Sequence, residues 1–219
     1  HTRWATHGEP SDVNSHPHFN MDRTIAVVHN GIIENYLELR AELEAEGVKF
    51  LSQTDTEIAA HMVSKYYEGN LLDAVYKATA RFRGAYALGV VCADNANELV
   101  AVRKDSPLVV GLGEDENMIA SDIPAILKYT RNVYFLENGE FVHILGDKVT
   151  VLNENKEVVE KEVSEITWDV EAASKGGFDS FMAKEIYEQP KGVEDTLMRR
   201  LDENGRIKLD DIKITKEDL

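Results

Sequence analysis

The character of the sequence changes at Arg83-Gly84, and this change limits the folds that the chain can adopt. Before it, apolar residues recur at helical spacing among charged ones, and Thr54 with Glu57 three residues later forms a capping box. After it, short β-branched and apolar segments alternate with turn residues, which is the pattern of antiparallel strands. Helices followed by a run of strands predict an α+β fold with layered sheets.

The same patterns predict the individual elements. Helices are expected at residues 34–46, 54–69, 70–82, 123–129 and 180–201, the last broken by Pro190. Strands are expected at residues 24–28, 48–52, 85–93, 98–103, 108–112, 117–120, 133–136, 140–145 and 148–152. Asn138-Gly139 and Gly146-Asp147 are predicted hairpin turns between the last three strands. Residues 1–23, 163–177 and 206–219 are expected to be irregular.

The charge of the chain excludes some classes of partner. Its 219 residues hold 40 acidic against 24 basic side chains, a formal net charge of −16. Nucleic-acid phosphates are bound by basic faces, so no nucleic-acid partner is expected. No apolar run approaches the length of a membrane span, so no membrane partner is expected either. We interpret the acidity as a solvated surface.

The only cysteine of the chain is Cys92. A single cysteine cannot form an intramolecular disulfide, which favours a reducing, cytoplasmic compartment. Cys92 lies in the apolar segment 88–93, where a thiol is poorly ionised and inert. We therefore expect it in the core and not as a nucleophile.

Two polar stretches carry the candidate chemistry. The first is HTRWATHG at residues 1–8, and the second is VVHNG at 27–31, where an apolar strand is expected to end on Asn30-Gly31. A side-chain amide beside a glycine N–H offers two neutral donors that can hold a developing oxyanion. Arg3 offers a planar fork that fits a carboxylate. These groups predict a site that binds a small acid and stabilises charge on a carbonyl.

These stretches belong to a longer series of motifs. The series is HTRWATHGEP at 1–10, HPH at 16–18, VVHNGIIENY at 27–36, SQTDTE at 52–57, RGAYAL at 83–88, SPLVVGLG at 106–113, ASD at 120–122 and KEIYEQP at 184–190. With it the chain resembles, over nearly its whole length, the glutaminase domains of the glutamine–fructose-6-phosphate aminotransferases (isomerizing), or glucosamine-6-phosphate synthases. The resemblance implies a four-layer αββα fold of the N-terminal-nucleophile (Ntn) hydrolases, as in class II glutamine amidotransferases. It also implies that a nucleophilic cysteine, with the first strands and helix of that fold, precedes His1.

The resemblance assigns the two ends of glutamine to two charged residues. Arg3 would bind the α-carboxylate and Asp55 the α-ammonium, which together are what a zwitterion needs. Asp55 also lies inside the capping box, and from the residues alone it is explained by the dipole of the helix that begins there.

Other roles follow from the same resemblance. Asn30 and Gly31 would form the oxyanion hole. A hairpin turn is the alternative for this pair, although a helix and not a returning strand is expected after it. Trp4 would gate the passage of ammonia, and the polar residues Thr6, His7 and His16 would shape the substrate pocket.

Five of the seven histidines lie within the first 29 residues. A metal site is the competing explanation, but the spacings fit no zinc signature and no cysteine joins them. We therefore expect no metal and no cofactor, and His29 is expected to be a hydrogen-bonded core residue.

The resemblance also predicts the organisation of the protein. Residues 1–201 would form the glutaminase domain, and 202–219 a linker towards a sugar-phosphate isomerase domain. The parent, expected to be a homo-oligomer, would hydrolyse glutamine to glutamate and pass ammonia to fructose 6-phosphate. Two alternatives stay open: another class II glutamine amidotransferase, and an amino-acid-binding module without a nucleophile. The segments 4–7 and 184–190 argue against the first alternative.

Overall fold

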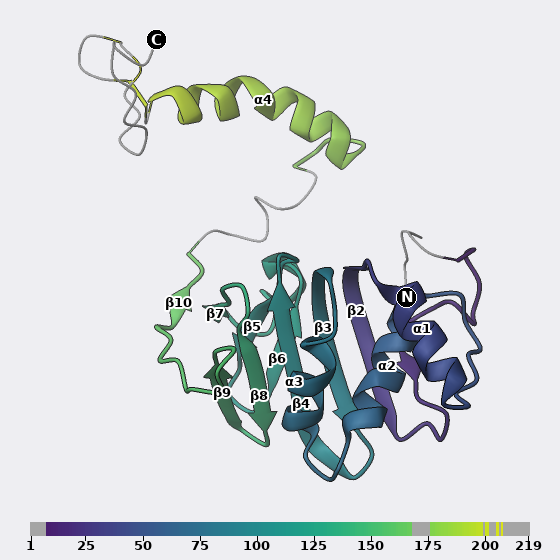
Figure 1. Cartoon of the computed structure of the whole chain (residues 1–219). Coiled ribbons are helices and arrows are strands. Elements are labelled where there is room, and N and C mark those ends of the chain that lie inside the picture. The colour runs from purple at the N-terminus through teal and green to yellow at the C-terminus, as the bar shows by residue number, and fades with distance from the viewer. Residues whose placement is uncertain (1–7, 168–175, 199, 202–204, 206, 208–219) are drawn as a thin grey trace, which may run out of the picture. The chain divides into compact units, whose positions relative to one another are not determined.

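The computed structural model describes residues 8–167, 176–198, 200–201, 205 and 207. Tertiary contacts divide the chain into two units, residues 1–167 and 168–219. Among the described residues, the first unit holds the sheets, three α-helices and a short 3₁₀ helix, and the second holds one long helix (Figure 1).

Along the chain, the first three α-helices come before most of the strands. The helices are α1 Tyr36–Ala45, α2 Asp55–Tyr66, α3 Leu71–Thr79, the 3₁₀ helix η1 Ile123–Ala125, and α4 Phe181–Met198. The strands are β1 His18–Phe19, β2 Ile25–Ile33, β3 Gly84–Cys92, β4 Asn95–Lys104, β5 Val109–Leu112, β6 Asn117–Ala120, β7 Asn132–Phe135, β8 Phe141–Leu145, β9 Lys148–Leu152 and β10 Ser164–Glu165. This order confirms the α+β prediction.

The strands of the first unit form two sheets. One has six strands in the order β1-β2-β3-β4-β8-β9, and the other has four in the order β10-β7-β5-β6. Every pair of neighbouring strands in both sheets is antiparallel. The strand β2, which carries the candidate site, therefore lies inside the larger sheet, between β1 and β3.

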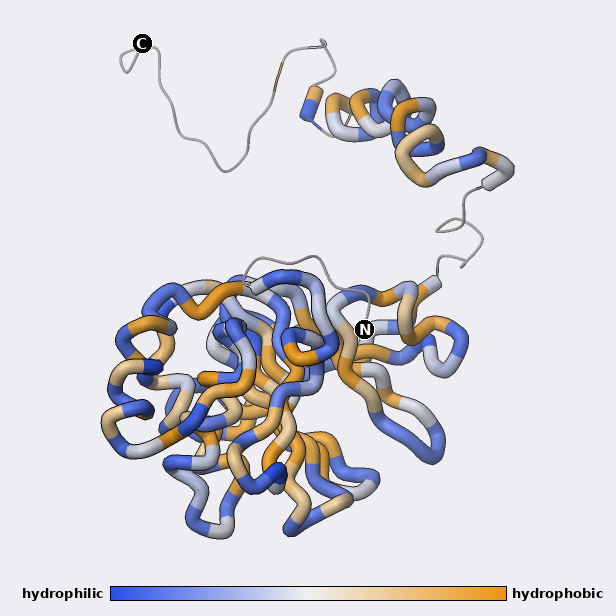
Figure 2. The backbone as a smooth tube through the Cα atoms, turned by 90° about the vertical axis from the view of Figure 1, so that its right-hand side faces the viewer, coloured by the Kyte–Doolittle hydropathy of each residue, from blue (hydrophilic) through white to orange (hydrophobic). Residues whose placement is uncertain are grey.

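Helices α1, α2 and α3 cover one face of the six-stranded sheet (Figure 1). Alternate residues of a strand point to opposite faces, so β3 directs Leu88 and Val90 to the helices and Ala87 to the second sheet. The second sheet does the same: Val110 packs between the sheets, while Val109 packs with η1 on the outer face. Figure 2 shows the hydrophobic segments gathered in the interior of this unit.

The two sheets approach closely at Gly89 in β3. A Cβ atom there would lie 2.7 Å from Cδ1 of Ile119 in β6, well inside van der Waals contact. A glycine at this position lets the sheets pack where a larger residue would hold them apart.

Several predicted elements are corrected by the structure. Residues 48–52 form no strand, because the N–H groups of Leu51 and Ser52 bond to the Glu57 side chain and not to a neighbouring strand. Asn138-Gly139 forms no hairpin, since β7 and β8 lie in different sheets. Gly146-Asp147 does form one, between β8 and β9. The helix predicted at 123–129 is reduced to η1.

In the second unit, α4 runs through Pro190 without a break. The residues on either side of the proline are exposed, so water can hydrate the carbonyl that the proline leaves without a donor. Nearly all of the predicted linker at 202–219 lies outside the described residues. No helix in the described parts of the chain has the length and apolar character needed to cross a membrane.

Candidate functional site

Asn30 and Gly31 lie within β2 and not at its end, which corrects the prediction. The strand continues to Ile33 because β3 runs beside it without interruption, pairing Asn30 with Ala87 and Gly31 with Tyr86. The side chain of Asn30 is exposed. The candidate oxyanion donors are thus held by a sheet, which is more rigid than a turn.

Gly31 has a φ of +116°, a conformation that L side chains rarely adopt. A Cβ atom there would overlap the carbonyl oxygen of Ala85 and lie 2.7 Å from Oγ of Ser106. Both the backbone angle and the space therefore require glycine. The altered angle turns the peptide plane away from the orientation of a regular strand.

Asp55 begins α2 and is only 4% exposed. Its Oδ2 accepts a hydrogen bond of 2.9 Å from the N–H of Ile33 and lies 3.8 Å from Nδ1 of His29. The carboxylate therefore joins the first turn of α2 to the end of β2, two residues beyond Gly31. The helix dipole, which the sequence suggested as an explanation, is compatible with this position.

Thr56, the next residue, contacts two histidines. Its Oγ1 lies 3.1 Å from Nε2 of His16 and 3.0 Å from Nδ1 of His29. Thr56 and His29 are buried, and His16 is half-buried. The prediction that His29 is a hydrogen-bonded core residue is confirmed.

Asn30 and His16 border one cavity of about 400 Å³. Both sheets contribute to its walls: His29 and Gly89 come from the larger sheet, and Ile119 from the smaller. Asp55 is not among the described residues that line the cavity, but its Oδ2 lies 3.8 Å from Nδ1 of His29, which does line it. The structure therefore brings Asn30 and His16 to one hollow and connects Asp55 to its wall.

The remaining predicted site residues lie in the first seven positions. Arg3, Trp4, Thr6 and His7 are outside the described residues, so their roles stay predictions. The described residues contain no group of three or more metal-binding side chains that could hold an ion. Cys92 is buried in β3 at 4% exposure, which confirms its prediction as a core residue.

The contact between the HPH segment at 16–18 and the TDT segment at 54–56 was not predicted from the sequence. Thr54 Oγ1 lies 3.0 Å from Nε2 of His18, as Thr56 does from His16. The two histidines are separated by one residue, and so are the two threonines that they contact. That shared spacing was the signal available in the sequence, although nothing in it indicates that the two segments face each other.

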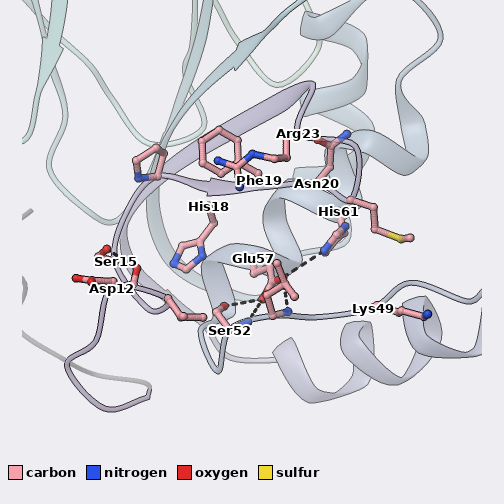
Figure 3. Close-up of a pocket in the computed structure, with 14 residues that line it drawn as sticks. Asp12, Ser15, His18, Phe19, Asn20, Arg23, Lys49, Ser52, Glu57 and His61 are labelled. Carbon is pink, nitrogen blue, oxygen red and sulfur yellow. Dashed lines mark hydrogen bonds and ion pairs between the residues drawn. The ribbon is translucent and has the colours of Figure 1, made fainter.

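A second hollow of about 570 Å³ lies beside the loop before β1 (Figure 3). Its floor holds the buried carboxylate of Glu57, which accepts hydrogen bonds from the N–H groups of Leu51 and Ser52 and from the Ser52 hydroxyl. Burial alone would raise the pKa of Glu57, but these bonds and His61 together lower it to about 2. Because the Glu57 carboxylate accepts these hydrogen bonds from Leu51 and Ser52, it fixes the conformation of the loop at 51–54.

Comparisons with known proteins identify the family of the chain. A family model described as "Glutamine amidotransferase domain" matches residues 1–128, more than half of the chain. The chain therefore belongs to the glutamine amidotransferase domain family.

Its relatives carry a particular name. The chain is 62% identical over 217 residues to "Glutamine--fructose-6-phosphate aminotransferase [isomerizing]" of Clostridium perfringens (strain 13 / Type A), covering 99% of this chain and 36% of the relative. It is 55% identical over 197 residues to the protein of the same name from Aquifex aeolicus (strain VF5), covering 90% and 33%. The chain thus spans about a third of the length of these relatives, and the resemblance found in the sequence is confirmed.

A solved structure shares the fold. Glutamine phosphoribosylpyrophosphate amidotransferase from B. subtilis superimposes with a TM-score of 0.60 at 24% identity, over 72% of this chain and 35% of that chain. At this identity the likeness concerns the fold alone. The predicted amidotransferase fold with paired antiparallel sheets is therefore confirmed.

Proposed function

We propose that this chain is the glutaminase domain of a glutamine–fructose-6-phosphate aminotransferase. The observation that carries the proposal is the pairing of Asn30 and Gly31: an exposed amide on the wall of a cavity, followed by a backbone position that only glycine can occupy. Two such neutral donors match the needs of a carbonyl oxygen that gains charge.

In the proposed binding mode, Arg3 holds the α-carboxylate of glutamine and Asp55 its α-ammonium. Oδ2 of Asp55 accepts from the N–H of Ile33, and a carboxylate keeps further acceptor positions after one hydrogen bond. Burial makes a lone charge costly, which favours the zwitterion over a ligand that carries only one of the two charges. Trp4, Thr6, His7 and His16 line the rest of the pocket in this proposal.

In the proposed reaction, a cysteine thiolate from a segment preceding this sequence attacks the side-chain amide carbon. The carbonyl electrons move onto oxygen, where the Asn30 amide and the Gly31 N–H hold them. The C–N bond then breaks, and nitrogen takes a proton to leave as ammonia. Water hydrolyses the thioester, giving glutamate and restoring the thiol. Cys92 takes no part because it is buried in β3.

The relatives named above are almost three times as long as this chain. We therefore propose that a sugar-phosphate isomerase domain elsewhere in the protein receives the ammonia and transfers it to fructose 6-phosphate. A homo-oligomer in the cytoplasm remains part of the proposal. The segments 4–7 and 184–190 favour fructose 6-phosphate as the acceptor of ammonia over the acceptor of another class II amidotransferase.

A second candidate is an amino-acid-binding module without a nucleophile, which the burial of the only thiol favours. The test measures glutamate release from glutamine by the 219-residue chain, by its Cys92→Ser variant, and by the chain extended at its N-terminus with the preceding coding sequence. Activity only in the extended chain, when that extension begins with cysteine, supports the glutaminase. Glutamine binding without turnover in every form would instead support the module. Turnover by the 219-residue chain that Cys92→Ser abolishes would overturn the assignment of Cys92 to the core.

A further inference from the structure

Thr56 contacts two histidines of the candidate site but has no role in the proposed reaction. Its hydroxyl lies about midway between two imidazoles from different segments, at 3.1 Å from His16 and 3.0 Å from His29. We infer that Thr56 is a positioning residue, which sets the ring orientation of both histidines and thereby the placement of the Asn30 amide in the glutaminase site. This inference rests on the proposed function.

The hydroxyl of Thr56 couples the protonation of the two rings. A hydroxyl has one proton to donate, whereas each imidazole nitrogen either donates or accepts. Because Oγ1 has one proton but two acceptor lone pairs, at least one of the two ring nitrogens at hydrogen-bond distance must carry an N–H that donates to it. A bare nitrogen on one ring therefore requires an N–H on the other, and neither ring can turn without losing its bond to Oγ1.

This coupling reaches the oxyanion donors through the backbone of β2. His29 directly precedes Asn30, and Asp55, which directly precedes Thr56, binds the N–H of Ile33. Two adjacent residues at the start of α2 thus hold β2 on both sides of Asn30 and Gly31. A shift of this strand by a fraction of an ångström would move the amide relative to the oxygen that gains charge.

His16 transmits the constraint to the cavity itself. It comes from the loop before β1, it lines the same cavity of about 400 Å³ as Asn30, and its Nε2 is held by Thr56. Because these contacts shape a wall near the reacting carbonyl, removing the hydroxyl should affect the chemical step more than the capture of glutamine.

The experiment compares Thr56→Val, which keeps shape but removes the hydroxyl, with Thr56→Ser, which keeps the hydroxyl. Thr79→Val is the matched control: Thr79 is also buried, but its hydroxyl bonds only to the backbone of its own helix at Val75 and Tyr76. All variants are made in the full-length protein, and glutaminase kcat and KM are measured well below the melting temperature of each variant.

We expect Thr56→Val to lower kcat about 10-fold with KM changed less than about 3-fold, the size of effect for one hydrogen bond that acts in the transition state. Thr56→Ser should recover most of kcat, and Thr79→Val should leave it unchanged. Equal loss in Thr56→Val and Thr79→Val, or no recovery with serine, would overturn the inference.

A second readout separates this inference from the proposed function. Imidazole nitrogen chemical shifts report the tautomer of each histidine, and those of His16 and His29 should change together in Thr56→Val but not in Thr79→Val. A full-length protein without glutaminase activity would refute the proposed function. Unchanged imidazole shifts in Thr56→Val would refute the coupling whether or not the enzyme is active.

Discussion

The carboxylate of Asp55 accepts a hydrogen bond of 2.9 Å from the backbone N–H of Ile33. This one bond joins the first residue of α2 to the last residue of β2, the strand that contains Asn30 and Gly31. In the proposed site, the group that recognises the ammonium of glutamine therefore also fixes the strand that carries the oxyanion donors.

The two tasks of Asp55 can be separated by mutation. Asp55→Asn keeps an oxygen that can accept from Ile33 but loses the charge, so we expect near-normal folding and a KM for glutamine raised at least about 10-fold. Asp55→Ala loses both functions and should also lower the melting temperature. Steady-state kinetics with thermal denaturation measures both effects, and an unchanged KM in Asp55→Asn would remove Asp55 from the ammonium site.

Asn30→Ala tests the oxyanion hole. Loss of one donor should lower glutamine hydrolysis by about 10²–10³-fold. Synthesis with added ammonia in the full-length protein should remain nearly intact, because the proposed sugar domain catalyses that step alone. If both activities fell together, Asn30 would be required for folding and not for charge stabilisation.

Gly31→Ala should lower the free energy of unfolding by more than the positive φ alone would cause. Gly47 has a similar angle, +92°, yet a Cβ atom there meets nothing within 4 Å, so Gly47→Ala measures the backbone cost, about 1 kcal/mol. Gly31→Ala adds overlap with the carbonyl of Ala85 and should cost several times as much, about 3 kcal/mol or more. Urea denaturation of the two variants measures the difference, and equal costs would contradict the tight approach.

Glu57 should make the fold sensitive to acid. Its pKa is lowered from 4.5 to about 2, so its contribution to stability is complete above pH 4.5 and is lost as the pH falls towards 2. The shift corresponds to a contribution on the order of 3 kcal/mol.

Glu57→Gln should therefore lower the free energy of unfolding at pH 7 and flatten its decline between pH 4.5 and about pH 2. Glu68→Gln is the control, because Glu68 is exposed and paired only with Lys77 at the surface. A similar pH profile for Glu57→Gln and the unsubstituted protein would show that the buried carboxylate contributes no such linkage.

The sequence predicted those parts of the fold that depend on local patterns. Thr54 caps its helix as expected, accepting from the N–H of Glu57, and Asn70 caps the next helix in the same way by accepting from the N–H of Asp73. The strands from β3 to β9 appear where β-branched residues alternate with turns. Elements decided by distant partners were mispredicted: β3 extends β2 through Asn30-Gly31, and Glu57 captures the N–H groups of the segment expected to form a strand at 48–52.

The sequence suggested residues for the candidate site, whose roles stay predictions, but not the contacts between them. Asn30, Gly31 and Asp55 were identified by spacing and resemblance. The bridge from His16 through Thr56 to His29 joins segments up to 40 positions apart, and no local pattern encodes such pairing. The bond from Ile33 to Asp55 also joins distant positions, 22 apart, and depends on how α2 packs on the sheet.

The burial of Cys92 keeps the only thiol of the 219-residue sequence from reacting with reagents in solution. With its only thiol enclosed in β3, the folded 219-residue chain should ignore alkylating reagents and react once per molecule only after unfolding. A single cysteine supplied at an N-terminal extension would then be the sole accessible thiol of the folded chain. A fluorescent electrophile could label it selectively and report directly on whether glutamine or an analogue occupies the cavity beside Asn30.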